Sequence, residues 1–188
     1  MSKEIIIVGG GFAGVNLARK LANVKGCRVT LVDKNNYNFF PPLIYQVATG
    51  FLEPSNVSYP FRKLFHNKAN LRFRLGELTK IVSEENTVIL SNGELKYDYL
   101  VIATGTESNY FGMEDIKKHS LPLKTIDDAI ELRNTLLLKA EEMTRTTDET
   151  LRSKLGNIVI AGSFLPRKKI AVDSLTRRGA PKIRPTNL

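Results

Sequence analysis

Cysteine and histidine are scarce in this sequence, and no apolar run is long. Cys27 is the single cysteine, which excludes an internal disulfide and fits a reducing compartment. His66 and His119 have no cysteine or histidine partner at ligand spacing, so we expect surface histidines and no metal site. No apolar stretch is long enough to cross a bilayer, and no charged and apolar leader precedes the first strand. We therefore expect a soluble, cytoplasmic protein.

The net charge of +9 argues less for a nucleic-acid partner than its size suggests. Residues 163–188 contribute +6 of this charge and the first 162 residues contribute +3. Basicity is therefore a property of the tail. A nucleic-acid or anionic-membrane binder acting through residues 167–169 and 177–184 is the weakest functional alternative, because a solvated, unstructured tail has the same composition. We expect no nucleic-acid partner.

The most informative stretch runs from residue 4 to residue 33. An apolar run leads into the pattern Gly9-x-Gly11-x-x-Gly14, a helical stripe follows, and a second apolar strand ends on Asp33. In this strand, turn and helix context each glycine has a task. The first allows a sharp turn, the second lets the backbone approach a pyrophosphate, and the third lets the helix pack against the sheet. The context predicts dinucleotide binding.

The chemistry of this turn suits an anion. The first backbone N–H groups of a helix have no partner within the helix, and that end carries a partial positive charge, so a pyrophosphate is a natural ligand. Asp33 lies 19 residues after Gly14, where a carboxylate can accept a hydrogen bond from a ribose hydroxyl. FAD and NAD share this pattern, and the pattern alone leaves both open.

The rest of the chain predicts further α/β elements. Residues 35–50 are expected to form a shaped loop that leads into a short helix, and a helix is expected over residues 59–65, with Pro60 near its first turn. Three short stretches are expected to form a small antiparallel meander: 71–75, 78–82 and 87–90.

The second half of the chain contains a buried strand and a long helix. Residues 97–103 are expected to form a fully buried strand that ends in Thr104 and Gly105. Residues 125–144 form a helix with Thr125 as its N-cap. Residues 157–162 repeat the opening apolar run, but no second glycine pattern follows Gly162, and no element is expected after it.

Four stretches together resemble one family. The glycine pattern, residues 40–50 (FPPLIYQVATG), the strand ending at residues 103–105 (Ala-Thr-Gly) and residues 127–137 (DDAIELRNTLL) are similar to type II NADH dehydrogenases. These are single-subunit, non-proton-pumping NADH:quinone oxidoreductases of the two-dinucleotide-binding-domain flavoprotein superfamily. The resemblance covers residues 3–162, and residues 40–50 carry its most particular part.

The resemblance implies that the glycine pattern binds FAD. It assigns the pyrophosphate to the three glycines, the ribose to Asp33, the adenine side to the backbone of Leu78, and the flavin ring to residues 46–50. The implied FAD-binding residues are Gly9, Gly11, Phe12, Ala13, Gly14, Asp33, Lys34, Gln46, Thr49, Leu78, Thr104 and Gly105. No catalytic residue is assigned.

The resemblance also implies substrates and a location for the full-length enzyme. In the family, NADH passes hydride to the flavin, and the reduced flavin passes electrons to quinone at the membrane face. We therefore expect NADH and quinone as the substrates, and peripheral association with the cytoplasmic face of the membrane. A homodimer is a further expectation.

The sequence departs from the family after Gly162. The second glycine pattern, which would bind NADH, is absent there, as are the later Gly-Asp element, the quinone-site motif and the membrane-association region. We expect a Rossmann-like FAD-binding domain over 1–124, and a connecting helix with the first strand of an incomplete NAD(P)H-binding domain over 125–162. A basic, non-native or disordered tail, from a frame change or a cloning junction, is expected over 163–188. Such a fragment would not catalyse the whole reaction.

Besides the nucleic-acid or anionic-membrane binder, two neighbouring families and one further non-catalytic function are alternatives. Disulfide reductases need a redox cysteine pair, and sulfide:quinone reductases also rely on cysteines, whereas this chain has Cys27 alone. Both alternatives therefore rank below an NADH dehydrogenase. The third alternative is a stand-alone dinucleotide-binding module without redox catalysis.

Overall fold

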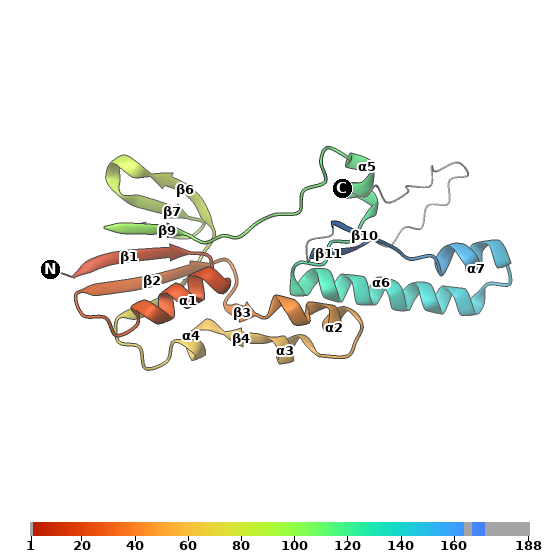
Figure 1. The fold of residues 1–188 in the computed structure, drawn as a ribbon, viewed down its shortest axis with the longest axis horizontal. Coiled ribbons are helices and arrows are strands. Elements are labelled where there is room, and N and C mark those ends of the chain that lie inside the picture. The colour runs from red at the N-terminus through yellow and green to blue at the C-terminus, as the bar shows by residue number, and fades with distance from the viewer. Residues whose placement is uncertain (1, 164–166, 172–188) are drawn as a thin grey trace. The chain divides into compact units, whose positions relative to one another are not determined.

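The computed structural model describes residues 2–163 and 167–171 (Figure 1). These residues divide into two compact units, and each is described by itself. The first unit comprises residues 2–43 and 53–107, and the second comprises residues 44–52, 108–163 and 167–171. Most of the expected basic tail, residues 164–166 and 172–188, lies outside the described residues.

A parallel sheet forms the centre of the first unit. Its strands are β1 (Lys3–Val8), β2 (Cys27–Asp33), β5 (Leu71–Leu75) and β9 (Tyr99–Ile102). Their order in the sheet is β5-β2-β1-β9, and β1 pairs in parallel with both β2 and β9. A helix follows the first strand and leads to its neighbour, as in a dinucleotide-binding α/β unit. This helix is α1 (Phe12–Leu21).

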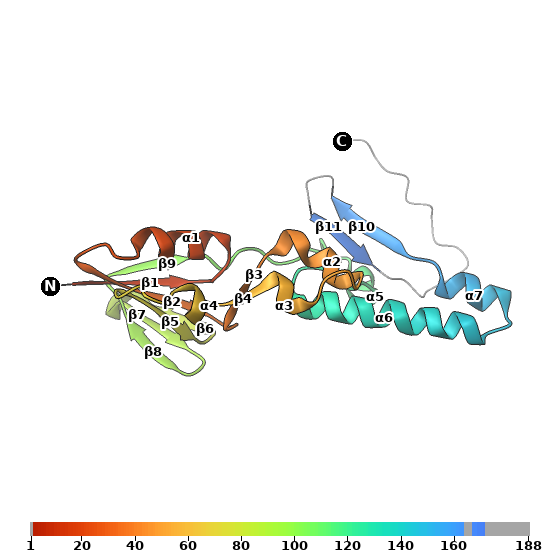
Figure 2. The same cartoon turned by 90° about the horizontal axis from the view of Figure 1, so that it is seen from below.

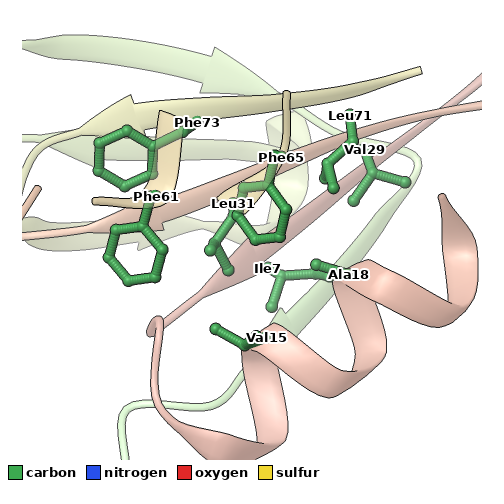
Figure 3. Close-up of a cluster of buried hydrophobic side chains, with 9 residues drawn as sticks. All are labelled: Ile7, Val15, Ala18, Val29, Leu31, Phe61, Phe65, Leu71 and Phe73. Atoms are coloured by element: carbon green, nitrogen blue, oxygen red, sulfur yellow. The ribbon is translucent and has the colours of Figure 1, made fainter. Parts of the chain in front are cut away.

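One face of this sheet is covered by α1 and by α4 (Phe61–Leu64). Val15 and Ala18, three positions apart on α1, meet apolar side chains that point out of the same face of the strands (Figure 3). The buried cluster comprises Ile7, Val15, Ala18, Val29, Leu31, Phe61, Phe65, Leu71 and Phe73. Because strand side chains alternate, the neighbouring residues Ile6 and Val32 point to the opposite face.

The opposite face is covered by a three-stranded antiparallel meander. It consists of β6 (Leu78–Val82), β7 (Thr87–Leu90) and β8 (Gly93–Lys96), with the 3-10 turn η2 (Ser83–Glu85) between the first two strands. Val88 and Leu90 of β7 pack with the apolar residues of this face. The α/β class, with a parallel sheet and a small antiparallel meander, is confirmed.

Two details of the strand predictions were wrong. Residues 71–75 do not belong to the meander, because β5 pairs in parallel with β2, and the third meander strand is instead the polar β8. The strand over 97–103 is not fully buried. Among the described strands β9 has only β1 as a neighbour, so Tyr99 and Ile102 are 58% and 51% exposed at the edge of the sheet.

A two-stranded ribbon precedes α4 in the first unit. Its strands are β3 (Tyr37–Phe39) and β4 (Ser58–Pro60), which pair antiparallel, and η1 (Pro41–Leu43) and α3 (Pro54–Val57) flank the segment between them. The helix expected over 59–65 is shorter, since Pro60 is its N-cap. A backbone bond from the Phe61 N–H to the Asn36 carbonyl, 3.0 Å long, continues the ribbon into α4.

The second unit contains the long helix. α2 (Ile44–Ala48) packs against α6 (Ile126–Arg145), and both lie side by side in Figure 2. Thr125 caps α6 as predicted, and Asp128 completes a capping box with it. The other elements are α5 (Glu114–His119), α7 (Glu149–Leu155), β10 (Val159–Ser163) and β11 (Arg167–Ala171). The sequence predicted neither α7 nor β11. No described helix combines the length and apolarity that spanning a membrane requires.

An exposed ion pair links the first strand of the sheet to the residue before β9. The Asp98 carboxylate accepts hydrogen bonds from the Glu4 N–H, at 2.8 Å, and from Lys3 Nζ, at 2.9 Å. The bond from the Glu4 backbone, followed by that from Lys3, holds the pKa of Asp98 below its usual value. The hydrogen bond to Asp98 in turn raises the pKa of Lys3.

The lowered pKa of Asp98 predicts a pH-dependent contribution to stability. A carboxyl whose folded pKa is depressed stabilises the protein above its unfolded pKa, and this contribution is lost as pH falls through the folded pKa. We expect Asp98→Asn to lower the free energy of unfolding at neutral pH, with the difference from wild type vanishing in strong acid. Urea unfolding at both pH values measures this effect. Glu94→Gln is the control, and an Asp98→Asn effect that is independent of pH would contradict the assignment.

Candidate functional site

Gly9 lies where β1 ends and the backbones of two neighbouring strands converge. Its φ is +108°, a conformation that favours glycine. Its N–H donates to the Val32 carbonyl at 2.8 Å. A Cβ added at Gly9 would lie 2.2 Å from the carbonyl oxygen of Ala103. The sharp turn predicted here therefore requires glycine on both conformational and steric grounds.

Gly14 and Gly11 differ sharply in the space around them. A Cβ at Gly14 would lie 1.8 Å from the Gly9 carbonyl oxygen, so α1 approaches the turn as closely as its backbone allows. A Cβ at Gly11 would have no atom within 4 Å. The protein thus leaves open space at the second glycine, where the pattern predicts the approach of a pyrophosphate.

Four consecutive backbone N–H groups are available at the start of α1. Gly11 is the N-cap of the helix without a side-chain cap, and the first bond into the helix is from the Val15 N–H to the Gly11 carbonyl, at 3.0 Å. Within the part of the chain that the structure describes, the N–H groups of residues 11–14 have no acceptor. The first turn also contains no acidic side chain. Donors without acceptors at a helix N-terminus form a site for an anion.

Asp33 lies beside this turn and binds its backbone. One carboxylate oxygen accepts a hydrogen bond from the Gly10 N–H at 2.5 Å, and the other accepts one from the Asn35 N–H at 2.7 Å. A carboxylate has about four lone-pair positions, so acceptor capacity for a ribose hydroxyl remains. Asp33 is thus held in place by amides on both sides.

Two residues that the sequence did not indicate also contact Gly10. The Asn38 side-chain amide donates to the Gly10 carbonyl at 2.7 Å. The ring of Phe61 lies so close that a Cβ at Gly10 would be 2.1 Å from its tip. Gly10 is the variable position between Gly9 and Gly11 of the pattern. In the sequence, only its place in this run of three glycines could have indicated a role for it.

Three other residues predicted for this site lie in the first unit. Thr104 is adjacent to Gly9, because a Cβ at Gly9 would lie 2.9 Å from its backbone nitrogen. Gly105 has a φ of +76° and open space around it. Phe12, at the first helical position, makes an edge-to-face contact with Phe40 at 5.7 Å between ring centroids.

The remaining predicted residues lie further along the chain. Lys34 is exposed directly after Asp33, and Leu78 is half-buried on β6, opposite Leu90. Gln46 and Thr49 belong to the second unit, where the Gln46 amide donates to the Tyr45 hydroxyl and the Thr49 hydroxyl donates to the Tyr45 carbonyl. Their approach to a flavin ring stays a prediction.

The family model described as pyridine nucleotide-disulphide oxidoreductase matches residues 3–164. The chain belongs to this family. The single cysteine of the chain, Cys27, packs against the core of the first unit.

Curated relatives within this group support the resemblance found in the sequence. The type II NADH:quinone oxidoreductase NdhA of Mycobacterium tuberculosis is 33% identical over 164 residues, which cover 85% of this chain and 35% of the relative. The type II NADH:quinone oxidoreductase of Haemophilus influenzae is 30% identical over 72% of this chain and 34% of its own length. The chain thus spans about a third of the curated relatives it matches. The resemblance to type II NADH dehydrogenases is confirmed.

Two solved structures have a fold similar to that of this chain. NDH2 of Plasmodium falciparum, in complex with NADH, matches with a TM-score of 0.73 and 27% identity, covering 82% of this chain and 32% of that one. The sulfide:quinone oxidoreductase of Aquifex aeolicus matches with a TM-score of 0.67 and 30% identity, over 74% of this chain and 33% of that one. The name of the second enzyme includes a quinone as a substrate.

Proposed function

We propose that this chain supplies the FAD-binding unit of an NADH:quinone oxidoreductase. The observation that carries the proposal is the row of four N–H groups at residues 11–14, which have no acceptor among the described residues, together with Gly9 and Gly14, where an added Cβ would clash with backbone atoms. Such a row binds the phosphates of a dinucleotide. The similarity to NADH:quinone oxidoreductases from several organisms supports FAD as the dinucleotide.

The residues present fit the adenine half of FAD. The open space at Gly11 leaves room for the pyrophosphate, and Asp33 keeps acceptor capacity for the ribose. In this proposal the backbone of Leu78 meets the adenine, Thr104 and Gly105 flank the nucleotide, and Gln46 and Thr49 approach the ring. The proposed FAD-binding residues also include Gly9, Phe12, Ala13, Gly14 and Lys34.

The role of these residues is binding and orientation. When bound, FAD supplies the chemistry that takes hydride from NADH and passes electrons to quinone. The partial positive charge at the start of α1 favours the pyrophosphate anion, and the half-buried Asp33 restricts the orientation of the ribose. The proposal extends to NADH and quinone as substrates of the whole enzyme and to peripheral attachment at the cytoplasmic face of a membrane.

Ligand titration of the purified 188-residue chain tests the proposal. We expect the chain to take up FAD, seen as flavin absorbance that remains after gel filtration, and not to respond to NADH in a separate titration. FMN is the matched control, because it contains the flavin ring but lacks the pyrophosphate and adenosine that the α1 turn recognises. Binding of FMN as tightly as FAD would contradict the assigned turn. Tight NADH binding without flavin uptake would favour a stand-alone NAD-binding module instead.

A further inference from the structure

The β3–β4 ribbon brings two side chains to a single residue of the glycine turn. Asn38, on β3, donates its side-chain amide to the Gly10 carbonyl, and Phe61, directly after β4, places its ring against the Cα of Gly10. Residues 38 and 10 are far apart in sequence, so this contact exists only in the folded chain. The ribbon and the residue after it therefore contact the glycine turn, although they are not part of the strand, turn and helix that form the dinucleotide-binding motif.

The Gly10 residue is held at both of its backbone groups. Its N–H donates to Asp33, and its carbonyl accepts from Asn38 at 2.7 Å. The Gly10 carbonyl and the Gly11 N–H belong to the same peptide group, which is trans. In a trans peptide these two groups point in opposite directions. A bond that fixes the Gly10 carbonyl towards Asn38 therefore also fixes the Gly11 N–H to point away from it.

We propose that Asn38 is a positioning residue for the dinucleotide turn. Its amide orients the Gly10–Gly11 peptide so that the Gly11 N–H joins the donors of residues 12–14, rather than rotating out of line with them. This inference rests on the proposed function, because the oriented donors serve the pyrophosphate of FAD. The role requires a neutral donor, since a carboxylate at position 38 would place negative charge against the Gly10 carbonyl.

The ribbon has other bonds that hold it without the Asn38 side chain. β3 and β4 keep their own ladder, the Phe40 N–H donates to the Val57 carbonyl at 2.8 Å, and the Phe61 N–H donates to the Asn36 carbonyl at 3.0 Å. Phe61 remains buried in the core. Changing the Asn38 side chain therefore removes the bond to Gly10 while leaving the ribbon supported, which separates positioning from folding.

Variants at position 38 test the role through FAD affinity and its pH dependence. Asn38→Ala is expected to raise the Kd for FAD about five- to tenfold, the size of one net hydrogen bond. Asn38→Asp is expected to raise it more than about tenfold at alkaline pH, because the ionised carboxylate cannot donate. Protonation restores a donor, so the ratio of the Asn38→Asp Kd to the wild-type Kd should fall as pH falls. The corresponding ratio for Asn38→Ala should stay constant.

A neighbouring asparagine supplies the matched control. Asn36→Ala changes an exposed side chain one residue before β3, for which the described part of the chain shows no side-chain hydrogen bond, and should leave the Kd unchanged. An Asn38→Ala variant that binds FAD like wild type would overturn the inference. So would an Asn38→Asp variant whose Kd ratio does not change with pH.

A measurement without ligand separates this inference from the proposed function. In the free chain, ¹⁵N relaxation should show larger fast motion of the Gly11 N–H in Asn38→Ala than in wild type and in Asn36→Ala. Equal Gly11 order parameters in all three chains would overturn the positioning role, whatever the FAD result. Failure of the wild-type chain to bind FAD, with the Gly11 difference present, would reject FAD as the ligand and retain Asn38 as the residue that orients the turn.

Discussion

Gly14→Ala should abolish tight FAD binding and weaken the fold together. The new Cβ would lie 1.8 Å from the Gly9 carbonyl oxygen, a backbone atom that cannot move aside as a flexible side chain can. Helix α1 must shift to relieve this contact, and the N–H groups at its start move with it. We expect the Kd for FAD to rise more than about 100-fold, because two lost charge-assisted bonds are each worth about 1.5–3 kcal/mol. Overpacking should cost about 1–3 kcal/mol of unfolding free energy.

Gly11→Ala is the matched comparison, because the same methyl group enters open space there. No atom lies within 4 Å of the added Cβ, and the backbone conformation at Gly11 suits any residue. The free energy of unfolding should change by less than about 1 kcal/mol, whereas the FAD affinity should fall, since the methyl occupies the space proposed for the pyrophosphate. FAD titration and urea unfolding of both variants measure the two effects. A Gly14→Ala chain with wild-type affinity would contradict the role of the turn.

Phe61→Ala should cause the largest loss of stability in the first unit. Phe61 is 1% exposed, stacks on Phe73 with 4.8 Å between ring centroids, and packs beside Phe65. Truncating such a residue removes apolar burial and leaves a cavity, which costs about 3–5 kcal/mol. That loss is a large fraction of the total of about 5–15 kcal/mol that typical domains possess. The free energy of unfolding from urea titration, followed by circular dichroism, measures it.

An exposed phenylalanine supplies the control for this loss. Phe51 is 79% exposed, so Phe51→Ala should change the free energy of unfolding by no more than about 0.5 kcal/mol. Phe61→Leu should fall between wild type and Phe61→Ala, because it retains part of the apolar volume. A Phe61→Ala variant as stable as Phe51→Ala would show that the packing between α4 and the sheet contributes little.

The glycine turn could be predicted from the sequence because its determinants are local. Gly9, Gly11 and Gly14 lie within six residues, and the task of each follows from the strand before them and the helix after them. The N-cap at Thr125, which the sequence also predicted, is local for the same reason. Binding of FAD by these residues stays a proposal, while the backbone geometry that suits it is observed.

The contacts of Gly10 could not be predicted, because their partners come from distant segments. Asn38 is one of several asparagines in a loop without a clean period, and only the pairing of β3 with β4 brings it to the turn. Strand pairing limited the prediction elsewhere as well. The residues of β5 suit a meander or a parallel sheet equally, and β9 is as apolar as a central strand, so neither the partner of β5 nor the edge position of β9 follows from composition.

The packing of α2 on α6 has a consequence for synthesis on the ribosome. The buried residues of α2, Ile44, Val47 and Ala48, belong to a helix whose partner begins only at Ile126. Chains emerge at about 5–20 residues per second, so this apolar surface waits several seconds for its partner while the parallel sheet is still gaining strands. A nascent chain arrested before α6 is therefore expected to expose these three apolar side chains to solvent. Synthesis of α6 allows these side chains to become buried.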